Sequence, residues 1–168
     1  MPASFRVFVG MGSNVGDRMA RLKAAVGAMD RLPCTKILRF SRVYETSPVG
    51  PRQRDFLNAA AELRTALPPV ELFRALKRIE RSLGRRTGKK WGPREIDLDL
   101  LFYGSRRVGT AALRIPHPRL HERKFVLRPL ADIAPRFRDP VTRLTAAALL
   151  RRLTAPDQRV NLYKRAIL

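Results

Sequence analysis

Hydrophobic and polar residues alternate with two different periods along the chain, and the changes between these periods predict its helices and strands. A period of two places apolar side chains on one face of a strand, whereas steps of three and four place them on one face of a helix. The pattern predicts strands over residues 5–9, 36–45, 56–66 and 95–103, and helices over residues 19–29 and 69–83. The glycine-rich stretch GMGSN is expected to form a turn after the first strand, and Asn14 or Asp17 to cap the first helix.

The chain after residue 103 is expected to add smaller elements. A short strand ends in LRIPHP, the apolar segment FVLRPLADIAP follows, residues 145–153 predict a helix, and the last dozen residues fit no clear element. The order β-α-β-β-α-β is typical of the ferredoxin-like arrangement, an antiparallel sheet with helices packed on one face. The predicted fold class is therefore α+β, with a ferredoxin-like βαββαβ core and extra C-terminal elements. No repeat or linker divides the chain, so a single domain over residues 1–168 is expected.

Composition bounds the class of protein. With 168 residues, of which 45% are apolar, the chain can bury one ordinary core. Its only cysteine, Cys34, excludes an internal disulfide and cannot alone form a zinc site. The start MPASFRVFVGMGSN carries no long apolar run, and no stretch approaches the roughly 20 apolar residues of a membrane span. We therefore expect a soluble, cytoplasmic protein without a membrane partner.

The net charge is the unusual feature of the composition. Lysine and arginine number 35 against 14 acidic residues, which gives a formal charge of +21. Such a surface attracts polyanions, whether nucleic acid, nucleotides or anionic membrane, but the charge does not choose among them. A basic ferredoxin-like RNA-binding module is therefore an alternative function, because aromatic residues on a sheet can stack on bases.

Two glycine-containing segments imitate phosphate-binding motifs without matching them. GMGSNVG has Val15 where a dinucleotide-binding fingerprint needs its third glycine. GRRTGKK has three residues between its glycines instead of four, and Lys90 where a P-loop carries serine or threonine. Neither segment therefore predicts a nucleotide site by itself.

The segment WGPREIDLDLLFYG (91–104) carries two carboxylates inside an otherwise apolar strand. Alternation places Asp97 and Asp99 on one face, about 6.5 Å apart along the strand. This spacing suits one or two hard cations such as Mg²⁺, which takes few protein carboxylates and completes its shell with water and phosphate oxygens. The alternative is a solvated face whose aspartates pair with lysines. The aspartates also argue against RNA binding, because carboxylates repel phosphate unless a metal bridges them.

A basic loop immediately before the aspartates strengthens the prediction of a phosphate site. Guanidinium groups hold phosphoryl oxygens in bidentate fashion and stabilise the charge that develops during transfer. Trp91, the only tryptophan, is either a core residue or a flat lid over a planar ligand. The cations of the loop are Arg85, Arg86, Lys89, Lys90 and Arg94.

Two further segments combine aromatic and polar groups. His117 lies between two prolines, which hold its backbone extended, and Arg123 and Phe125 follow closely. Phe56 and Asn58 share one side of a predicted strand, and an amide beside a ring suits a heterocycle with mixed donors and acceptors. Taken singly, His117 also fits an exposed turn and Phe56 also fits the core.

Together these motifs resemble one family. The ordered segments GSN (12–14), YETSPVGPRQRDFLNAA (44–60), LGRR (83–86), KKWGPREIDLDLLFYG (89–104) and IPHPRLHERKFVLRPLADIAP (115–135) are similar to those of the 6-hydroxymethyl-7,8-dihydropterin pyrophosphokinases of folate synthesis. The similarity covers residues 5–136 in unbroken order. It implies that ATP and 6-hydroxymethyl-7,8-dihydropterin are the partners, and that the terminal pyrophosphoryl group moves to the pterin hydroxymethyl oxygen with release of AMP.

The resemblance also implies roles for individual residues of this chain. Asp97 and Asp99 match the ligands of two Mg²⁺ ions. Arg85 and Arg94 match arginines that engage the phosphates during transfer. The implied ATP contacts are Glu80, Arg86, Trp91, Leu100, His117 and Arg123. The implied pterin contacts are Thr46, Pro48, Val49, Phe56, Asn58, Trp91 and Phe125, with the two phenylalanines as rings that sandwich the pterin.

The chain departs from the family pattern in three respects. Thr87 stands where a second arginine is common, so either Arg85 or Arg86 is the principal phosphate arginine. The tail beyond about residue 140 and the charge of +21 match nothing in the family. We expect a monomer without a nucleic-acid partner, in which positioning and electrostatics rather than a strong general base drive the transfer.

Overall fold

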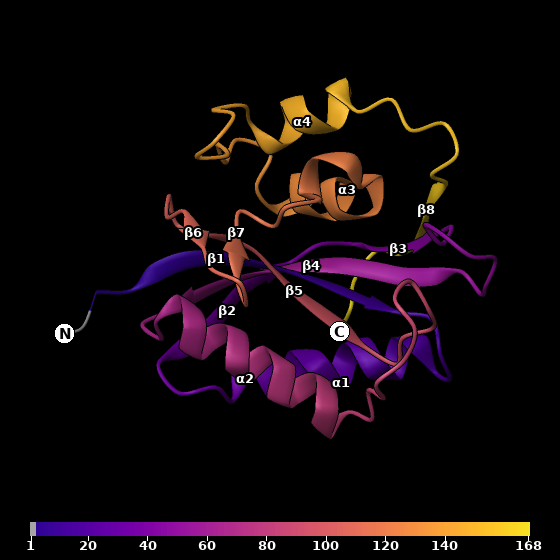
Figure 1. Ribbon diagram of the computed structural model, residues 1–168, viewed down its shortest axis with the longest axis horizontal. Helices are drawn as coiled ribbons and strands as arrows, with labels where there is room; N and C mark the ends of the chain where they lie inside the picture. Colours follow the sequence, from indigo (N-terminus) through magenta and orange to yellow (C-terminus); the bar gives the residue numbers. More distant parts are fainter. Residues whose placement is uncertain (1–2) are drawn as a thin grey trace.

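Figure 1 shows a computed structural model of the chain, in which residues 3–168 are described. The main sheet is antiparallel and has the order β5-β1-β4-β3-β8, with β2 pairing with β4 beside this path. The strands are β1 (Phe5–Ser13), β2 (Thr35–Phe40), β3 (Val43–Thr46), β4 (Phe56–Thr65), β5 (Asp97–Tyr103), β8 (Val160–Lys164) and a separate pair, β6 (Val108–Gly109) and β7 (Arg114–Ile115). The helices are α1 (Arg18–Asp30), α2 (Pro69–Ser82), α3 (Lys124–Ile133), α4 (Ala146–Arg152) and a 3₁₀ turn over Leu120–Glu122. The predicted α+β class with a ferredoxin-like core is confirmed.

Most of the predicted elements are present with small shifts of their ends, but one predicted strand is wrong. Residues 36–45 form two strands, β2 and β3, which both pair with β4. Ser41 separates them, because its hydroxyl oxygen, instead of a backbone carbonyl, accepts the N–H of Ala60 (2.8 Å). Of the two candidate caps, Asp17 caps α1 by accepting the N–H of Ala20 (3.0 Å).

The first strand is longer than predicted. GMGSN does not form a turn, because β1 continues through Ser13 and pairs with β4 on one side and β5 on the other. Gly12 is the register partner of Asn58 on β4 and of Asp97 on β5. Since glycine has no Cβ, polar side chains from both neighbouring strands can approach the backbone at this point.

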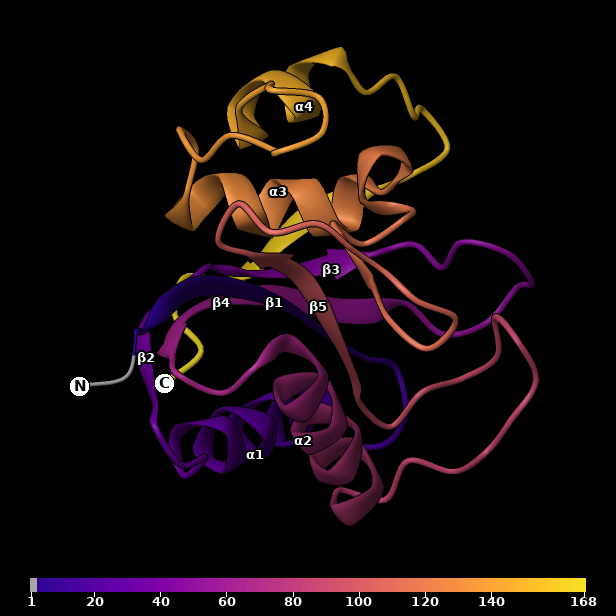
Figure 2. The same ribbon diagram turned by 60° about the vertical axis from the view of Figure 1, so that its left-hand side comes forward.

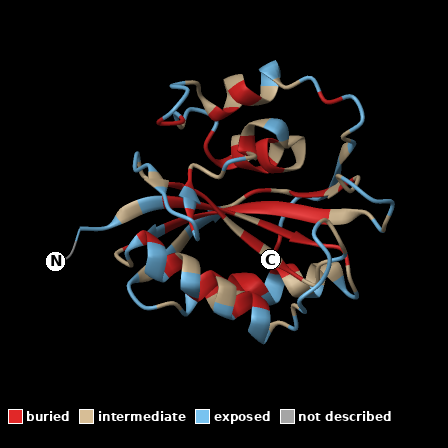
Figure 3. Cartoon of the chain, viewed as in Figure 1, coloured by how far each residue is buried: buried red, intermediate tan, exposed pale blue. Residues whose placement is uncertain are grey.

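Helices cover both faces of the sheet, which corrects the expected packing on one face. Helices α1 and α2 lie on one face, and α3, with α4 behind it, lies on the other (Figure 1, Figure 2). The segment FVLRPLADIAP forms α3, and its apolar stripe of Val126, Leu127, Leu130 and Ile133 is buried against the sheet. Two hydrophobic cores therefore lie on opposite faces of the sheet, and the strands between them are largely buried (Figure 3).

The alternation expected for β5 is confirmed. Leu98 and Leu100 belong to the core against α1 and α2, whereas Leu101 belongs to the core against α3. Toward the end of β5, a β-bulge opposite Phe8 and Val9 shifts the register between β5 and β1. The two aspartates therefore lie on the α3 side, at the end of the strand that the core of α3 leaves open.

The last residues of the chain form what we call the C-terminal strap, residues 153–168. After α4 the strap returns along the edge of the sheet and pairs β8 with β3 (Figure 1). Ile167 is then buried in the core on the opposite face. Backbone pairing and polar side-chain contacts hold much of the strap, so no hydrophobic period in the sequence predicts it.

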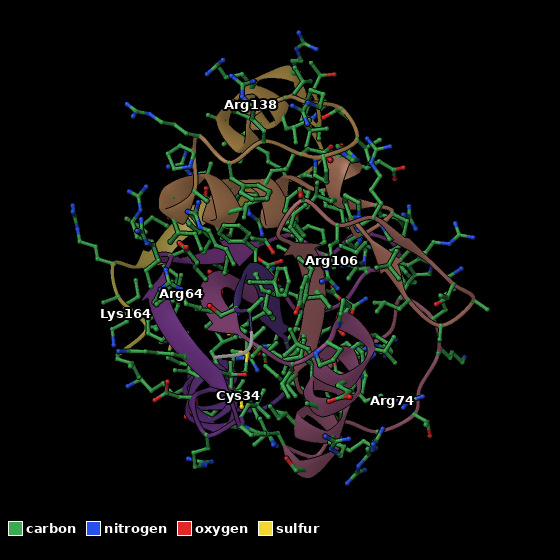
Figure 4. The ribbon with its side chains drawn as sticks, turned by 90° about the vertical axis from the view of Figure 1, so that its left-hand side faces the viewer. Cys34, Arg64, Arg74, Arg106, Arg138 and Lys164 are labelled. Atoms are coloured by element: carbon green, nitrogen blue, oxygen red, sulfur yellow. The ribbon has the colours of Figure 1, made fainter. Side chains whose placement is uncertain are left out.

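The positive charge is distributed over several elements. Figure 4 labels Arg64 on β4, Arg74 on α2, Arg106 after β5 and Arg138 before α4, and all four are exposed. Cys34 is also exposed. No helix within residues 3–168 is long and apolar enough to cross a membrane. The distribution of charge identifies no partner by itself.

Candidate active site

A cavity of about 420 Å³ opens on the α3 face, where the second half of β1 runs between the starts of β4 and β5. It brings together twelve of the predicted residues: Thr46, Val49, Phe56, Asn58, Arg85, Trp91, Arg94, Asp97, Asp99, His117, Arg123 and Phe125. Its lining also includes Ser47, Lys77 and Arg119, for which the sequence predicts no role. Pro48, Glu80, Arg86 and Leu100 lie outside this lining.

The two aspartates of β5 each lie beside an arginine. Arg85 Nη1 is 2.7 Å from Asp97 Oδ1, and Arg123 Nη1 is 4.0 Å from Asp99 Oδ2. Burial and the neighbouring charge of Asp97 raise the pKa of Asp99 to about 7. Within residues 3–168, no third His, Cys, Asp or Glu joins the pair in a group that could hold a metal ion. A cation bound here would therefore take its remaining ligands from water or substrate.

Glu80, predicted as a nucleotide contact, lies beneath the cavity wall and organises two of its cations. Its carboxylate is 2.5 Å from Arg85 Nη1 and 2.8 Å from Lys77 Nζ, and it accepts the backbone N–H of Leu98 (2.7 Å). Burial lowers the pKa of Arg85, but the charges of Asp97 and Glu80 outweigh this effect and raise it above the ordinary value. Glu80 thus orients Arg85 and Lys77 toward the aspartates. Lys77 lies three residues before Glu80 on α2, and this spacing alone could have predicted their ion pair.

Asn14 joins the loop before β5 to the loop before β4. Its side-chain oxygen accepts the N–H of Arg94 (2.8 Å), and its own N–H donates to the carbonyl of Arg94 (3.0 Å). Its amide nitrogen donates to Gln53 Oε1 (2.9 Å), and Gln53 Nε2 donates to the carbonyl of Trp91 (2.7 Å). The sequence signal was the GSN motif, but the helix-capping hypothesis for Asn14 assigned it the wrong partner.

Trp91 lies on the cavity surface rather than in the core. Its ring lies 4.3 Å below the guanidinium carbon of Arg119, and the carbon of Arg123 lies 5.5 Å from the same ring. Its backbone has a φ of +65°, a conformation that few residues other than glycine adopt. Arg86 is exposed, and its N–H donates to Glu95 (3.4 Å). Of the two candidate phosphate arginines, only Arg85 therefore lies in the cavity.

On the other side of β1 from the aspartates, the cavity lining combines rings with an amide. Phe56 comes from β4 and Phe125 from the start of α3, and both line the cavity. Asn58 Nδ2 donates to Thr46 Oγ1 (2.7 Å), which fixes the direction of the buried amide. A flat heterocycle that lies between the rings can thus meet a fixed donor and acceptor at its edge.

A second hollow of about 270 Å³ adjoins the first and shares Asp99, His117 and Pro118 with it. Leu100 lines this hollow with Phe73, Leu98 and Leu113, which make its floor apolar. Burial, followed by the charge of Arg123, lowers the pKa of His117 to about 4, so its ring is neutral near pH 7. Its Nδ1 accepts the N–H of Arg119 (3.2 Å), which leaves Nε2 as the donor.

Comparison with known proteins gives consistent matches. The family model described as 7,8-dihydro-6-hydroxymethylpterin-pyrophosphokinase (HPPK) matches residues 8–135. A 2-amino-4-hydroxy-6-hydroxymethyldihydropteridine pyrophosphokinase of Bacillus subtilis is 43% identical over 127 residues, which cover 75% of this chain and 76% of that protein. The Pseudomonas aeruginosa protein of the same name is 42% identical over 136 residues, covering 80% and 84%.

Solved structures show the same fold. A crystal structure of Plasmodium falciparum HPPK-DHPS with STZ-DHP matches with a TM-score of 0.69 and 16% identity. The match covers 90% of this chain and 42% of that longer chain. At this identity the likeness concerns the fold alone.

Carboxylates that can hold a metal ion and guanidinium groups that can bind phosphates are the groups that phosphoryl-transfer enzymes use, and the two rings in the same cavity suit a planar substrate. With the match over residues 8–135, the chain belongs to the 7,8-dihydro-6-hydroxymethylpterin-pyrophosphokinase family. Enzymes of this family transfer pyrophosphate from ATP to hydroxymethyldihydropterin in folate biosynthesis, and the predicted function is confirmed.

Proposed function

We propose that this chain performs the transfer in the 420 Å³ cavity, with the pterin between Phe56 and Phe125 and the polyphosphate of ATP along β5. One observation carries the proposal: a single cavity is lined by Asp97 and Asp99 of β5, by Phe56 and Asn58 of β4 on the far side of β1, and by Phe125 of α3. The hydroxymethyl group of the pterin can then meet the phosphates without either substrate leaving the cavity.

The chemistry follows from this arrangement. The hydroxymethyl oxygen attacks the β-phosphorus, a new O–P bond forms, and the bond from that phosphorus to the oxygen bridging the α-phosphate breaks. AMP leaves with the bridging oxygen, and the alcohol proton passes to solvent. Negative charge grows on the bridging and non-bridging oxygens, and the guanidinium groups of Arg85 and Arg94 stabilise it. Positioning and electrostatics, rather than a strong base, account for catalysis.

Asp97 and Asp99 would hold one or two Mg²⁺ ions. A pair of carboxylates without a third protein ligand among the described residues fits Mg²⁺, which retains several water and phosphate ligands. The bound ion would supply Lewis-acid stabilisation of the phosphate charge. Burial and the charge of Asp97 raise the pKa of Asp99 to about 7, and the charges of Lys77 and Arg123 oppose this rise, so a bound cation would further favour the ionised carboxylate.

The second hollow is the proposed site for the base of ATP. Phe73, which is half-buried, can contact the face of a purine above an apolar floor that includes Leu98 and Leu100, while His117 offers a polar edge. Because the hollow shares Asp99 with the main cavity, a nucleotide placed here directs its phosphates toward the acidic pair. This placement accounts for Leu100 as a nucleotide contact although it lies outside the main cavity.

The test of the proposed function is the product formed from ATP. With 6-hydroxymethyl-7,8-dihydropterin and Mg²⁺ the protein is expected to release AMP, and omission of the pterin or addition of EDTA is expected to stop it. Chromatography of the nucleotides measures both. ADP as the product would contradict pyrophosphoryl transfer, and an unchanged rate in EDTA would contradict the role of Mg²⁺.

Gly12→Ala is expected to damage pterin binding selectively. A Cβ at residue 12 would lie 2.6 Å from Asn58 Oδ1, and the bond to Thr46 prevents the amide from moving away freely. We expect the KM for pterin to rise about tenfold, the equivalent of one hydrogen bond to the substrate, with a smaller change in the KM for ATP.

Gly10→Ala is the matched control for this prediction. It lies on the same strand and face, and the atoms nearest to its Cβ would be side-chain carbons of Leu101 at 3.5–3.7 Å, which are ordinary contacts. Steady-state kinetics with each substrate varied in turn separates the two variants. Equal effects of both substitutions on pterin binding would contradict the assignment of Asn58.

A further inference from the structure

The C-terminal strap contacts both walls of the proposed pterin site from outside the cavity. It lies beyond residues 8–135, which the family model matches. We propose that Gln158 and Arg159, adjacent residues of the strap, are positioning residues that fix the two ring-bearing walls relative to each other. This inference rests on the proposed function, because it assigns the strap to the pterin half of that site.

Gln158 holds the wall that carries Phe125. Its Oε1 accepts the N–H of Lys124 (2.8 Å), and its Nε2 donates to the carbonyl of Glu122 (2.8 Å). Lys124 is the first residue of α3, and Arg123 at the N-cap makes no side-chain capping bond. Gln158 therefore caps this helix from a distant segment, since the first N–H groups of a helix have no partner within it. Gln158 thus binds Glu122 and Lys124, the two neighbours of Arg123, and Phe125 is the residue after Lys124.

Arg159 holds the wall that carries Phe56. Its N–H donates to Ser47 Oγ (2.9 Å), its carbonyl accepts the N–H of Ser47 (3.0 Å), and its guanidinium pairs with the carboxylate of Asp55. Ser47 follows Thr46 at the end of β3, and Asp55 precedes Phe56 at the start of β4. One residue thus joins both ends of the loop between these strands.

The two sets of contacts are consecutive in the chain, so the strap couples the walls rigidly. A planar ligand between two rings loses affinity when the gap between them changes by about 1 Å, because stacking contacts and edge hydrogen bonds depend on the same spacing. The strap itself contributes no residue to the lining of the cavity. Its effect on the pterin is therefore indirect, through Phe125 on one side and Phe56 on the other.

Arg159→Ala and Gln158→Ala test the inference, with Arg165→Ala, an exposed residue of the same strap, as the control. The measurements are the Kd of 6-hydroxymethylpterin in the presence of a non-hydrolysable ATP analogue by calorimetry, the KM of each substrate, kcat and Tm. For Arg159→Ala we expect pterin Kd and KM to rise about threefold to tenfold, the usual cost of a lost cap or ion-paired contact, with kcat and the KM for ATP within about twofold.

Gln158→Ala is expected to raise the pterin Kd by a similar factor and also to raise the KM for ATP, because Arg123 lies between the two backbone groups that Gln158 binds. Arg159→Lys, which keeps a cation for Asp55, is expected to restore most of the pterin affinity. Asp55→Asn is expected to weaken pterin binding as Arg159→Ala does, and the double variant to be no weaker than either, because the two residues act as one pair.

Pterin affinities within twofold of the unmodified protein in both alanine variants would overturn the inference while leaving the proposed function intact. An equal loss in Arg165→Ala, or a fall in Tm with parallel loss of both substrates in all three variants, would also overturn it in favour of general stabilisation. If the unmodified protein releases no pterin-dependent AMP, the proposed function fails and the inference fails with it.

Discussion

Asp97→Asn is expected to lower kcat/KM by about 10³-fold or more, because it removes a carboxylate charge at the point where the substrates and the cation meet. Asparagine has nearly the same shape, so Arg85 keeps a polar neighbour and its bond to Glu80. The side chain of Asp97 is 34% exposed, so water can hydrogen-bond to the new amide and the substitution creates no buried polar group without a partner. We expect Tm to change by only a few degrees. AMP release at saturating ATP and pterin gives the rate, and circular dichroism gives Tm.

Glu95→Gln is the control for this substitution. Glu95 lies two residues before Asp97 and accepts the N–H of Arg86 (3.4 Å) outside the cavity. We expect its loss to change kcat/KM by less than about threefold, as for a surface residue without contact to the reacting groups. If Asp97→Asn keeps a tenth of the activity, or if both substitutions reduce it equally, the proposed metal and phosphate site on β5 is wrong.

Arg85→Ala is expected to reduce kcat by about 10²–10³-fold, the range found when one preorganised donor to a developing charge is removed. Arg85 Nη1 lies between Asp97 Oδ1 at 2.7 Å and Glu80 Oε2 at 2.5 Å, so the guanidinium is held in place before any substrate binds. Since its alanine variant leaves the buried Glu80 with Lys77 as its remaining cation, a moderate fall in Tm should accompany the loss. Arg85→Lys, which keeps the charge but not the planar fork, is expected to recover part of the rate.

Arg86→Ala provides the comparison that decides between the two adjacent arginines. Arg86 is exposed outside the cavity, and we expect its loss to change kcat by less than about threefold. Single-turnover measurements with both variants separate the transfer step from product release. A larger effect at Arg86 than at Arg85 would show that the loop rearranges when ATP binds and exchanges the two residues.

Some residues of the candidate site could be predicted from the sequence, and others could not. Asp97 and Asp99 were assigned correctly to one face of a strand, because strand alternation is a local property of the backbone. Phe56 and Asn58 followed from the same rule. Lys77 and Gln53 could not be found in this way, since their place depends on contacts with residues far away in the sequence. Glu80 is buried and pairs with Arg85 and Lys77, and its predicted contact with the nucleotide stays a prediction.

The sequence by itself determined the elements whose signal is local: the helices over residues 18–30 and 69–82, the strand over 56–65, and the acidic pair with its basic loop. The tertiary structure alone decided the division between β2 and β3, the extension of β1 through GMGSN, the position of α3 on the second face, and the strap. The physical reason is that hydrophobic period and chain stiffness act over a few residues. Strand pairing, two-sided burial and the gap between Phe56 and Phe125 depend on segments a hundred residues apart, which meet only in the folded chain.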